Sequence, residues 1–165
     1  VADEERHQPA GQRAGVAEYY RKVFFDEYLP RRSAVTPDFP ERDKDFSASA
    51  SYLAEHLHEV PVLVIPCVDA RPEDKGPLAQ AGAYGNFLPA AWSFMLALRA
   101  RDLVSAWTTL HIRYEREVGA LLGIPEKVTQ AALIPVAHST GGEFRAARRV
   151  PVRERTYWDT WGRTR

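Results

Sequence analysis

The chain has 165 residues, 45 % of them hydrophobic and 27 % charged, a composition typical of one soluble globular domain. Its 22 basic and 22 acidic side chains give a net charge of zero, so no overall field favours nucleic acid or an anionic membrane. Cys67 is the single cysteine, so an intrachain disulfide is excluded. Because no apolar run is long enough to span a bilayer and no signal peptide is present, we expect a cytoplasmic protein.

Two helices and an intervening loop are predicted for the first third of the chain. Apolar side chains recur at helical spacing over 16–28 and again over 47–59. Three prolines lie between these segments, and because proline blocks continuation of a helix, they predict a loop over 30–40. We therefore expect the N-terminal part of the chain to be mainly helical.

A buried strand and a long helix are predicted next. The short β-branched run 60–68 is typical of a strand buried on both faces, and Cys67 within it is expected to be a buried structural thiol. The polar stretch 69–85 contains glycine and proline and predicts a loop. The stretch 88–101 predicts the strongest helix, with Pro89 near its first turn and apolar side chains over most of its circumference.

The last third alternates strand and helix. A short strand is predicted over 104–110, followed by an amphipathic helix over 115–122 that Gly123 closes. A second buried strand is predicted over 128–136, and the glycine pair within 138–143 predicts a turn. Strands that alternate with helices indicate a layered α/β or α+β domain.

Most potential catalytic or metal-binding side chains have a simpler structural explanation. No catalytic triad, zinc motif or phosphate-binding loop is present. His56 and His58 lie two residues apart on a predicted helix, so they point to different faces and are expected at the surface. Asp69, Glu73 and Asp74 suggest a metal site, but a solvated loop is the default interpretation.

The segment 107–110 is the first candidate binding element. It places two hydroxyls beside a bulky aromatic ring at a strand end, where irregular backbone can present amides to the polar edge of a planar ring. An ordinary strand end with a core tryptophan is the alternative. The candidate residues are Trp107, Thr108, Thr109 and Leu110.

Arg148 and Arg149 are the second candidate. Seven arginines lie between 145 and the C-terminus, against Glu154 and Asp159. Paired guanidinium groups bind phosphate well because their fork of donors matches its oxygens. A solvated basic tail is the alternative interpretation of this segment.

Four stretches, taken together and in order, give the sequence a family resemblance. They are 52–68, 84–111 (which ends in AWTTLH), 121–137 and 144–152. In these stretches the chain resembles the FMN-dependent nitroreductase family over roughly 52–161. The resemblance implies one nitroreductase-like domain over 1–165.

The resemblance also implies a fold and an activity. The expected fold is α+β, with a central mixed or antiparallel sheet flanked by helices, in an intertwined homodimer that holds FMN at the subunit interface. The expected enzyme uses NADH or NADPH to reduce FMN, which then reduces nitroaromatics, quinones or similar small-molecule electron acceptors. Because the flavin carries out the chemistry, no catalytic side chain is expected.

Cofactor-binding residues follow from the same resemblance. The segment 107–110 is expected beside the isoalloxazine ring, where it offers backbone hydrogen bonds. Arg149, with Arg148 as its neighbour, is expected to bind the FMN phosphate. Gly85 and Asn86, which precede the long helix of the dimer interface, complete the expected set.

The sequence departs from the family at its N-terminal end. Members usually open with an R-x-S-x-R-like phosphate-binding segment and then a P-S-x-x-N-x-Q-P-W segment, neither of which occurs here. We therefore expect the N-terminal FMN-binding part to be absent. Two alternatives stay open: a non-enzymatic homologue that sequesters flavin or binds a partner, and a small α/β module that binds an acidic partner through its arginine tail.

Overall fold

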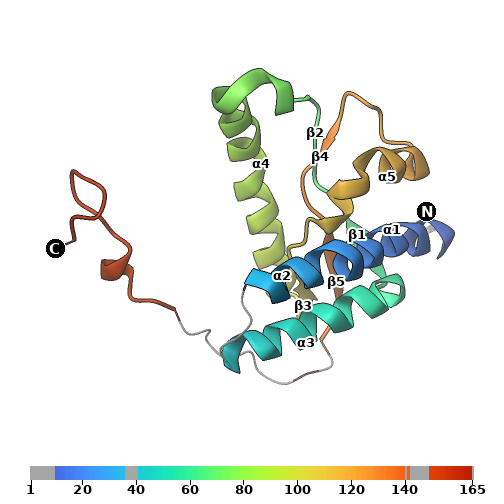
Figure 1. The fold of residues 1–165 in the computed structure, drawn as a ribbon. Helices are drawn as coiled ribbons and strands as arrows, with labels where there is room; N and C mark the ends of the chain where they lie inside the picture. The colour runs from blue at the N-terminus through green and yellow to red at the C-terminus, as the bar shows by residue number, and fades with distance from the viewer. Residues whose placement is uncertain (1–9, 36–40, 140, 142–148, 165) are drawn as a thin grey trace.

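Short antiparallel strands form the centre of the molecule (Figure 1). The larger sheet contains, in spatial order, β1 (Val62–Val64), β5 (Ile134–His138) and β3 (Leu103–Ser105). The smaller sheet pairs β2 (Cys67–Val68) with β4 (Thr129–Gln130). The computed structural model describes residues 10–35, 41–139, 141 and 149–164, and over these residues the protein has an α+β fold.

The predicted strand 60–68 forms as two short strands. Its first part pairs with β5 and its second with β4, and between them Pro66, which has no amide to donate, accepts a hydrogen bond from the Ala131 amide at 2.9 Å. The expectation of burial on both faces is wrong, since β1 is an edge strand and Val62 is exposed. Cys67 is exposed too, so its prediction as a buried thiol is wrong.

Helices cover one face of the larger sheet. They are α1 (Ala10–Val23), the π-helical turn η1 (Phe24–Tyr28), α2 (Leu29–Val35), α3 (Glu41–His56) and the 3₁₀ turn η2 (Leu57–Glu59). The helices predicted over 16–28 and 47–59 are confirmed. Their core is a cluster of buried side chains that includes Val16, Tyr20, Phe24, Leu57, Leu63 and Leu133.

The loop predicted over 30–40 is wrong for its first part, because the helix continues through Pro30 to Val35. The five residues before α2 form a π-helical turn, in which the Leu29 amide donates to the carbonyl of Phe24. A proline ring normally clashes with the carbonyl one turn earlier, and the wider π turn lets the chain continue as helix. Residues 36–40 lie outside the described part of the chain.

The long helix α4 (Gly76–Arg99) covers the opposite face of the sheet. Ala91 is buried against Ile134 and Val136, while the adjacent Leu133 belongs to the other face, as the alternation along a strand requires. The helix predicted over 88–101 is confirmed, but it starts twelve residues earlier, so the loop over 69–85 is wrong from Gly76 onward. Pro89 therefore lies inside the helix, not in its first turn.

In the last third the predicted helix is confirmed, whereas the strand predicted over 128–136 forms as β4 and β5, which belong to different sheets. The helix α5 (Glu115–Leu122) ends at Gly123, whose φ of 71° is the left-handed conformation that favours glycine. The strand predicted over 104–110 is shorter: after β3 there is only a single bridge at Thr108, and the 3₁₀ turn η4 (Leu110–Tyr114) follows. The turn predicted over 138–143 lies partly outside the described residues.

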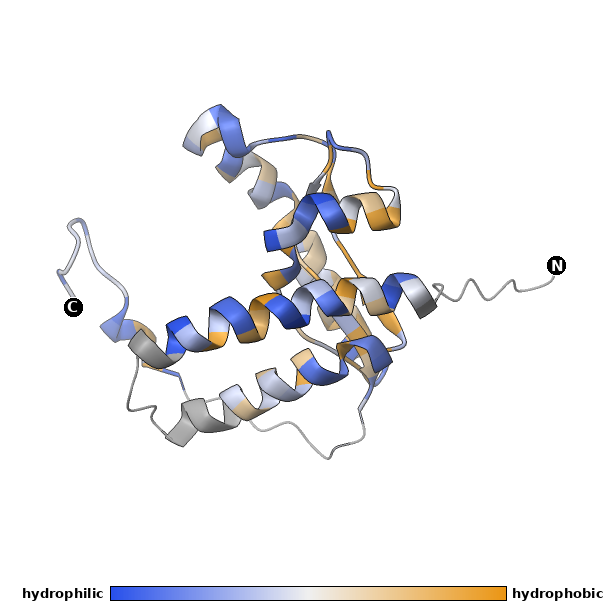
Figure 2. Ribbon diagram, turned by 45° about the vertical axis from the view of Figure 1, so that its right-hand side comes forward, coloured by the Kyte–Doolittle hydropathy of each residue, from blue (hydrophilic) through white to orange (hydrophobic). Residues whose placement is uncertain are grey.

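Figure 2 shows that hydrophobic residues are concentrated in the central strands, between the helices. The segment 149–164, with the 3₁₀ turn η5 (Val152–Glu154), extends away from the body of the molecule in Figure 1. Tyr157 and Trp161 contact each other there, with ring centroids 4.7 Å apart. Among the described residues, no helix is long and apolar enough to cross a membrane.

Candidate functional site

The segment 107–110 is anchored through Thr108. Its amide donates to the carbonyl of Leu133 at 3.0 Å, the Leu133 amide donates back at 2.8 Å, and the Thr108 hydroxyl donates to the same carbonyl at 2.9 Å. Both backbone groups of Thr108 are therefore hydrogen-bonded within the fold. Within the described residues, the amides of Trp107 and Thr109 donate to no backbone carbonyl.

An aromatic pocket of about 470 Å³ lies beside this segment. Residues 106–110 form one wall, and the other walls come from α1 with η1 and from α3. We call it the aromatic pocket because six ring-bearing side chains line it: Tyr20, Phe24, Tyr28, Tyr52, His56 and Trp107. From the sequence, the segments 16–28 and 47–59 are predicted only as helices, since the same 3.6-residue spacing serves a core and a pocket wall.

Two contacts fix rings of the aromatic pocket. Burial raises the pKa of Tyr20 to about 12, and the Thr108 side chain, which contacts the phenol, opposes this shift. Tyr20 therefore stays neutral across the physiological range. Tyr52 and His56 stack with their centroids 4.2 Å apart, which adds a flat surface from α3.

Trp107 connects the aromatic pocket to α4. Its ring stacks on Phe87, with centroids 6.3 Å apart and planes 21° apart, and Phe87 in turn contacts Tyr84 edge-on at 5.9 Å. Gly85 and Asn86, the predicted cofactor-binding residues of this helix, flank Phe87 on its N-terminal side and are exposed. Neither lines the aromatic pocket.

Of the two predicted phosphate-binding arginines, Arg149 lies in the described part of the chain and does not line the aromatic pocket. Arg148 lies outside the described residues. Arg149 begins the C-terminal segment, which Figure 1 shows extended away from the body, whereas the segment 107–110 lies between β3 and η4 at its centre. One chain alone therefore does not bring the C-terminal segment to the aromatic pocket.

A second pocket, of about 850 Å³, adjoins the aromatic one. We call it the arginine pocket. It shares Tyr28, Thr109 and Leu110 with the aromatic pocket, and both are lined by the π-helical turn, a feature frequent at functional sites. No local sequence pattern predicts it, because its charged side chains come from the stretch 27–32 and from Arg113, more than eighty residues later. These side chains are Glu27, Arg31, Arg32 and Arg113.

His111 is fully buried directly after the segment 107–110. Neither ring nitrogen has a hydrogen-bond partner among the described residues. Burial lowers the pKa of His111 to about 4, although the nearby Glu115 carboxylate opposes this shift. The imidazole is therefore neutral at physiological pH.

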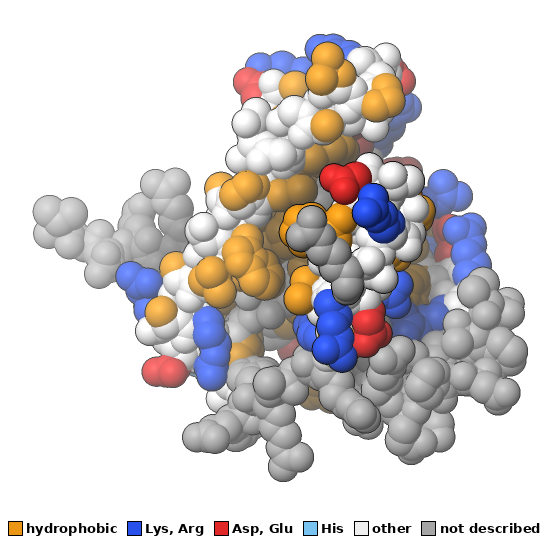
Figure 3. Space-filling model, turned by 90° about the vertical axis from the view of Figure 1, so that its left-hand side faces the viewer, with side chains coloured by type: hydrophobic (Ala, Val, Ile, Leu, Met, Phe, Trp, Pro, Cys, Tyr) orange, Lys and Arg blue, Asp and Glu red, His pale blue; other side chains and the backbone are white. Residues whose placement is uncertain are grey.

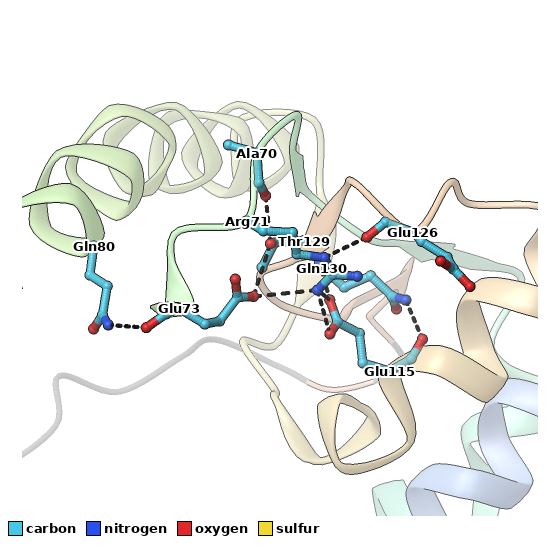
Figure 4. A network of polar contacts seen from close by, with 8 residues as sticks. All are labelled: Ala70, Arg71, Glu73, Gln80, Glu115, Glu126, Thr129 and Gln130. Carbon is cyan, nitrogen blue, oxygen red and sulfur yellow. Dashed lines mark hydrogen bonds and ion pairs between the residues drawn. The ribbon is translucent and has the colours of Figure 1, made fainter. Parts of the chain in front are cut away.

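A polar network beside the site fixes α5 against the smaller sheet (Figure 4). Nη1 of Arg71 lies 2.8 and 2.7 Å from the two carboxylate oxygens of Glu115, and its Nε donates to the carbonyl of Glu126. Glu115 also accepts from the amide of Gln130 at 2.9 Å. The Glu73 carboxylate, a metal candidate in the sequence, accepts from Arg71 and Thr129 in the same network.

Sequence comparisons add no relatives. Comparison with protein-family models gave no match, and comparison with curated proteins gave none either. Within the described residues, no group of three or more histidine, cysteine, aspartate or glutamate side chains is arranged to hold a metal ion. The two adjoining pockets on either side of Thr109 and Leu110 are therefore the features from which a function can be argued.

Proposed function

We propose that this chain binds FMN in the aromatic pocket and belongs to an oxidoreductase that uses NADH or NADPH to reduce nitroaromatic, quinone or similar acceptors. One observation carries the proposal. The segment 107–110, which the family resemblance assigns to the flavin ring, is a wall of a pocket lined by aromatic side chains.

The residues of the aromatic pocket fit a flavin ring in size and chemistry. Its volume of about 470 Å³ is within the range of small-molecule sites. Trp107 and Tyr52 present flat faces on which a planar ring can stack. The amides of Trp107 and Thr109, which donate to no backbone carbonyl among the described residues, are suited to hydrogen-bond the polar edge of the ring.

The protein contributes position and electrostatics to such a reaction. FMN, when bound, would supply the redox chemistry, the transfer of electrons from NADH or NADPH to the acceptor. Thr108 holds the segment 107–110 against Leu133, and Phe87 stacks on the ring of Trp107. Tyr20 keeps its proton, so no negative charge from it opposes a reduced, electron-rich ring.

Dimer formation is part of the same proposal. Large apolar side chains of α4 are exposed, among them Trp92 at 59 % and Leu96 at 54 %. Figure 3 shows hydrophobic side chains at the surface on this side of the molecule. Exposed apolar clusters of this kind mark interaction surfaces. We infer that a second copy covers α4, and that the C-terminal segment with Arg149 reaches a phosphate bound by the neighbouring chain.

A titration with FMN tests the pocket assignment. Replacing Trp107 by alanine removes a stacking surface, and stacking on an aromatic side chain contributes about 1–3 kcal/mol. We expect Trp107→Ala to weaken FMN binding roughly tenfold, measured by quenching of flavin fluorescence. Trp161→Ala, which changes an exposed ring on the C-terminal segment, is the matched control. Equal affinities for the two variants would refute the assignment.

A further inference from the structure

Two arginines from distant parts of the chain converge on one carboxylate in the arginine pocket. Nη2 of Arg31, on α2, is 3.3 Å from Oε2 of Glu27, and Nε of Arg113, on η4, is 3.1 Å from Oε1 of the same residue. Guanidinium groups present planar forks of donors that match carboxylate oxygens. The pocket therefore already holds a carboxylate group between two cations.

Two guanidinium groups, those of Arg31 and Arg113, share one carboxylate, that of Glu27, so this cluster carries one net positive charge. The side chains of Arg31 and Arg113 are 77 % and 65 % exposed, so their ion pairs with Glu27 contribute little net stability. An external anion can therefore join or replace the Glu27 carboxylate at little cost to the fold.

Most of the remaining wall is apolar or aromatic. Val23, Leu110 and Ile112 line it together with the ring of Tyr28. Arg32 donates from Nη1 to the Tyr28 hydroxyl at 3.0 Å, which orients that ring at the boundary with the aromatic pocket. A cationic end and an apolar remainder suit a ligand that combines an acid group with an aromatic ring.

We propose that the arginine pocket binds the carboxylate of an aromatic acid, which makes acidic aromatic compounds the acceptor class of the adjoining flavin site. Because the two pockets share Tyr28, Thr109 and Leu110, a ligand held by Arg31 and Arg113 lies next to the ring in the aromatic pocket. The assignment of the aromatic acid as an electron acceptor rests on the proposed flavin function. The binding of the acid in the arginine pocket does not depend on that function.

Calorimetric titration of the full, flavin-free chain with benzoate and with its neutral isostere benzamide tests the proposal. We expect benzoate to bind roughly fivefold more tightly than benzamide, the range of a partly exposed ion pair. Arg113→Gln should remove this preference, whereas Arg116→Gln, the same change at an exposed position on α5, should preserve it. Glu27→Gln should strengthen benzoate binding, a gain that misfolding cannot produce.

Several outcomes would overturn the acid site: equal binding of benzoate and benzamide, equal losses in Arg113→Gln and Arg116→Gln, or weaker binding in Glu27→Gln. Tighter binding of phenyl phosphate than of benzoate would overturn the choice of a carboxylate in favour of a phosphorylated ligand. The proposed flavin function and the proposed acid site can be refuted independently of each other. Benzoate binding without any FMN binding refutes the flavin function alone, and FMN binding without a preference for benzoate refutes the acid site alone.

Discussion

Thr108 and its two neighbours have different structural roles in the segment 107–110. Thr108 exchanges two backbone hydrogen bonds with Leu133 and contacts Tyr20 through its side chain. Trp107 and Thr109, on either side of it, line the aromatic pocket and have amides that donate to no backbone carbonyl among the described residues. One residue thus fixes the segment while the flanking residues remain available to a ligand.

His111 makes stability depend on pH. Because its folded-state pKa of about 4 is below the ordinary value of 6.5, the unfolded chain binds more protons between these values, and stability falls as the pH drops through this window. From pH 7.5 to pH 5 the loss from this group is about 2 kcal/mol. Between pH 7.5 and pH 5, the free energy of unfolding measured in urea should fall less for His111→Leu than for the exposed control His58→Leu. Identical losses in the two variants would contradict a buried, neutral His111.

The phosphate assignment of Arg149 predicts a difference within the C-terminal segment. We expect Arg149→Ala to weaken FMN binding more than Arg163→Ala does, because charge-assisted hydrogen bonds contribute about 1.5–3 kcal/mol each. Arg163 instead lies 3.7 Å from the carboxylate of Asp159. Fluorescence titration of both variants measures the difference, and equal effects would remove the phosphate role of Arg149.

At the scale of elements, the network around Glu115 joins α5 to the loop before α4 and to β4. Glu115→Ala leaves Arg71 and the Gln130 amide without their shared acceptor, and we expect a loss of about 2–3 kcal/mol in the free energy of unfolding. Asp69→Ala is the control, since the pair of Asp69 with Lys127 is 72 % exposed on both sides and should contribute under about 1 kcal/mol. Denaturant titration that gives similar losses for both variants would contradict the role of the network.

The sequence predicts the position of most elements, because helical spacing and β-branched runs are local signals. Two local signals mislead. The glycines and prolines of 69–85 suggest a loop, yet α4 begins at Gly76, and Pro30 suggests a break that a π-helical turn avoids. Tertiary packing accounts for α4, which is buried against the sheet through Ala91 and its neighbours. The local geometry of the π-helical turn accounts for Pro30.

The candidate site is only partly predictable for a related reason. The segment 107–110 is identified from sequence and does line a pocket. The pairing of Thr108 with Leu133, and the ion pair of Glu27 with Arg113 across 86 residues, depend on long-range topology that no local pattern encodes. The phosphate role of Arg149 stays a prediction, because it depends on where a second chain places its C-terminal segment.

At the scale of the whole molecule, the exposed apolar side of α4 predicts self-association. Leu96→Arg places a charge within that surface, and we expect it to shift the chain from dimer to monomer in light scattering coupled to size-exclusion chromatography. Ala120→Arg adds the same charge at an exposed position on α5 and should leave the dimer intact. A wild-type chain that is monomeric at all concentrations, or equal effects of both variants, would contradict a dimer through α4.

Flavin binding by the whole chain is the central claim, and one spectrum tests it most directly. The purified chain is mixed with FMN, desalted, and its visible absorbance recorded before and after addition of NADH or NADPH. We expect the flavin bands to remain with the protein and to bleach when the nicotinamide is added. A colourless protein after desalting would contradict the account and favour a homologue that binds no flavin by itself.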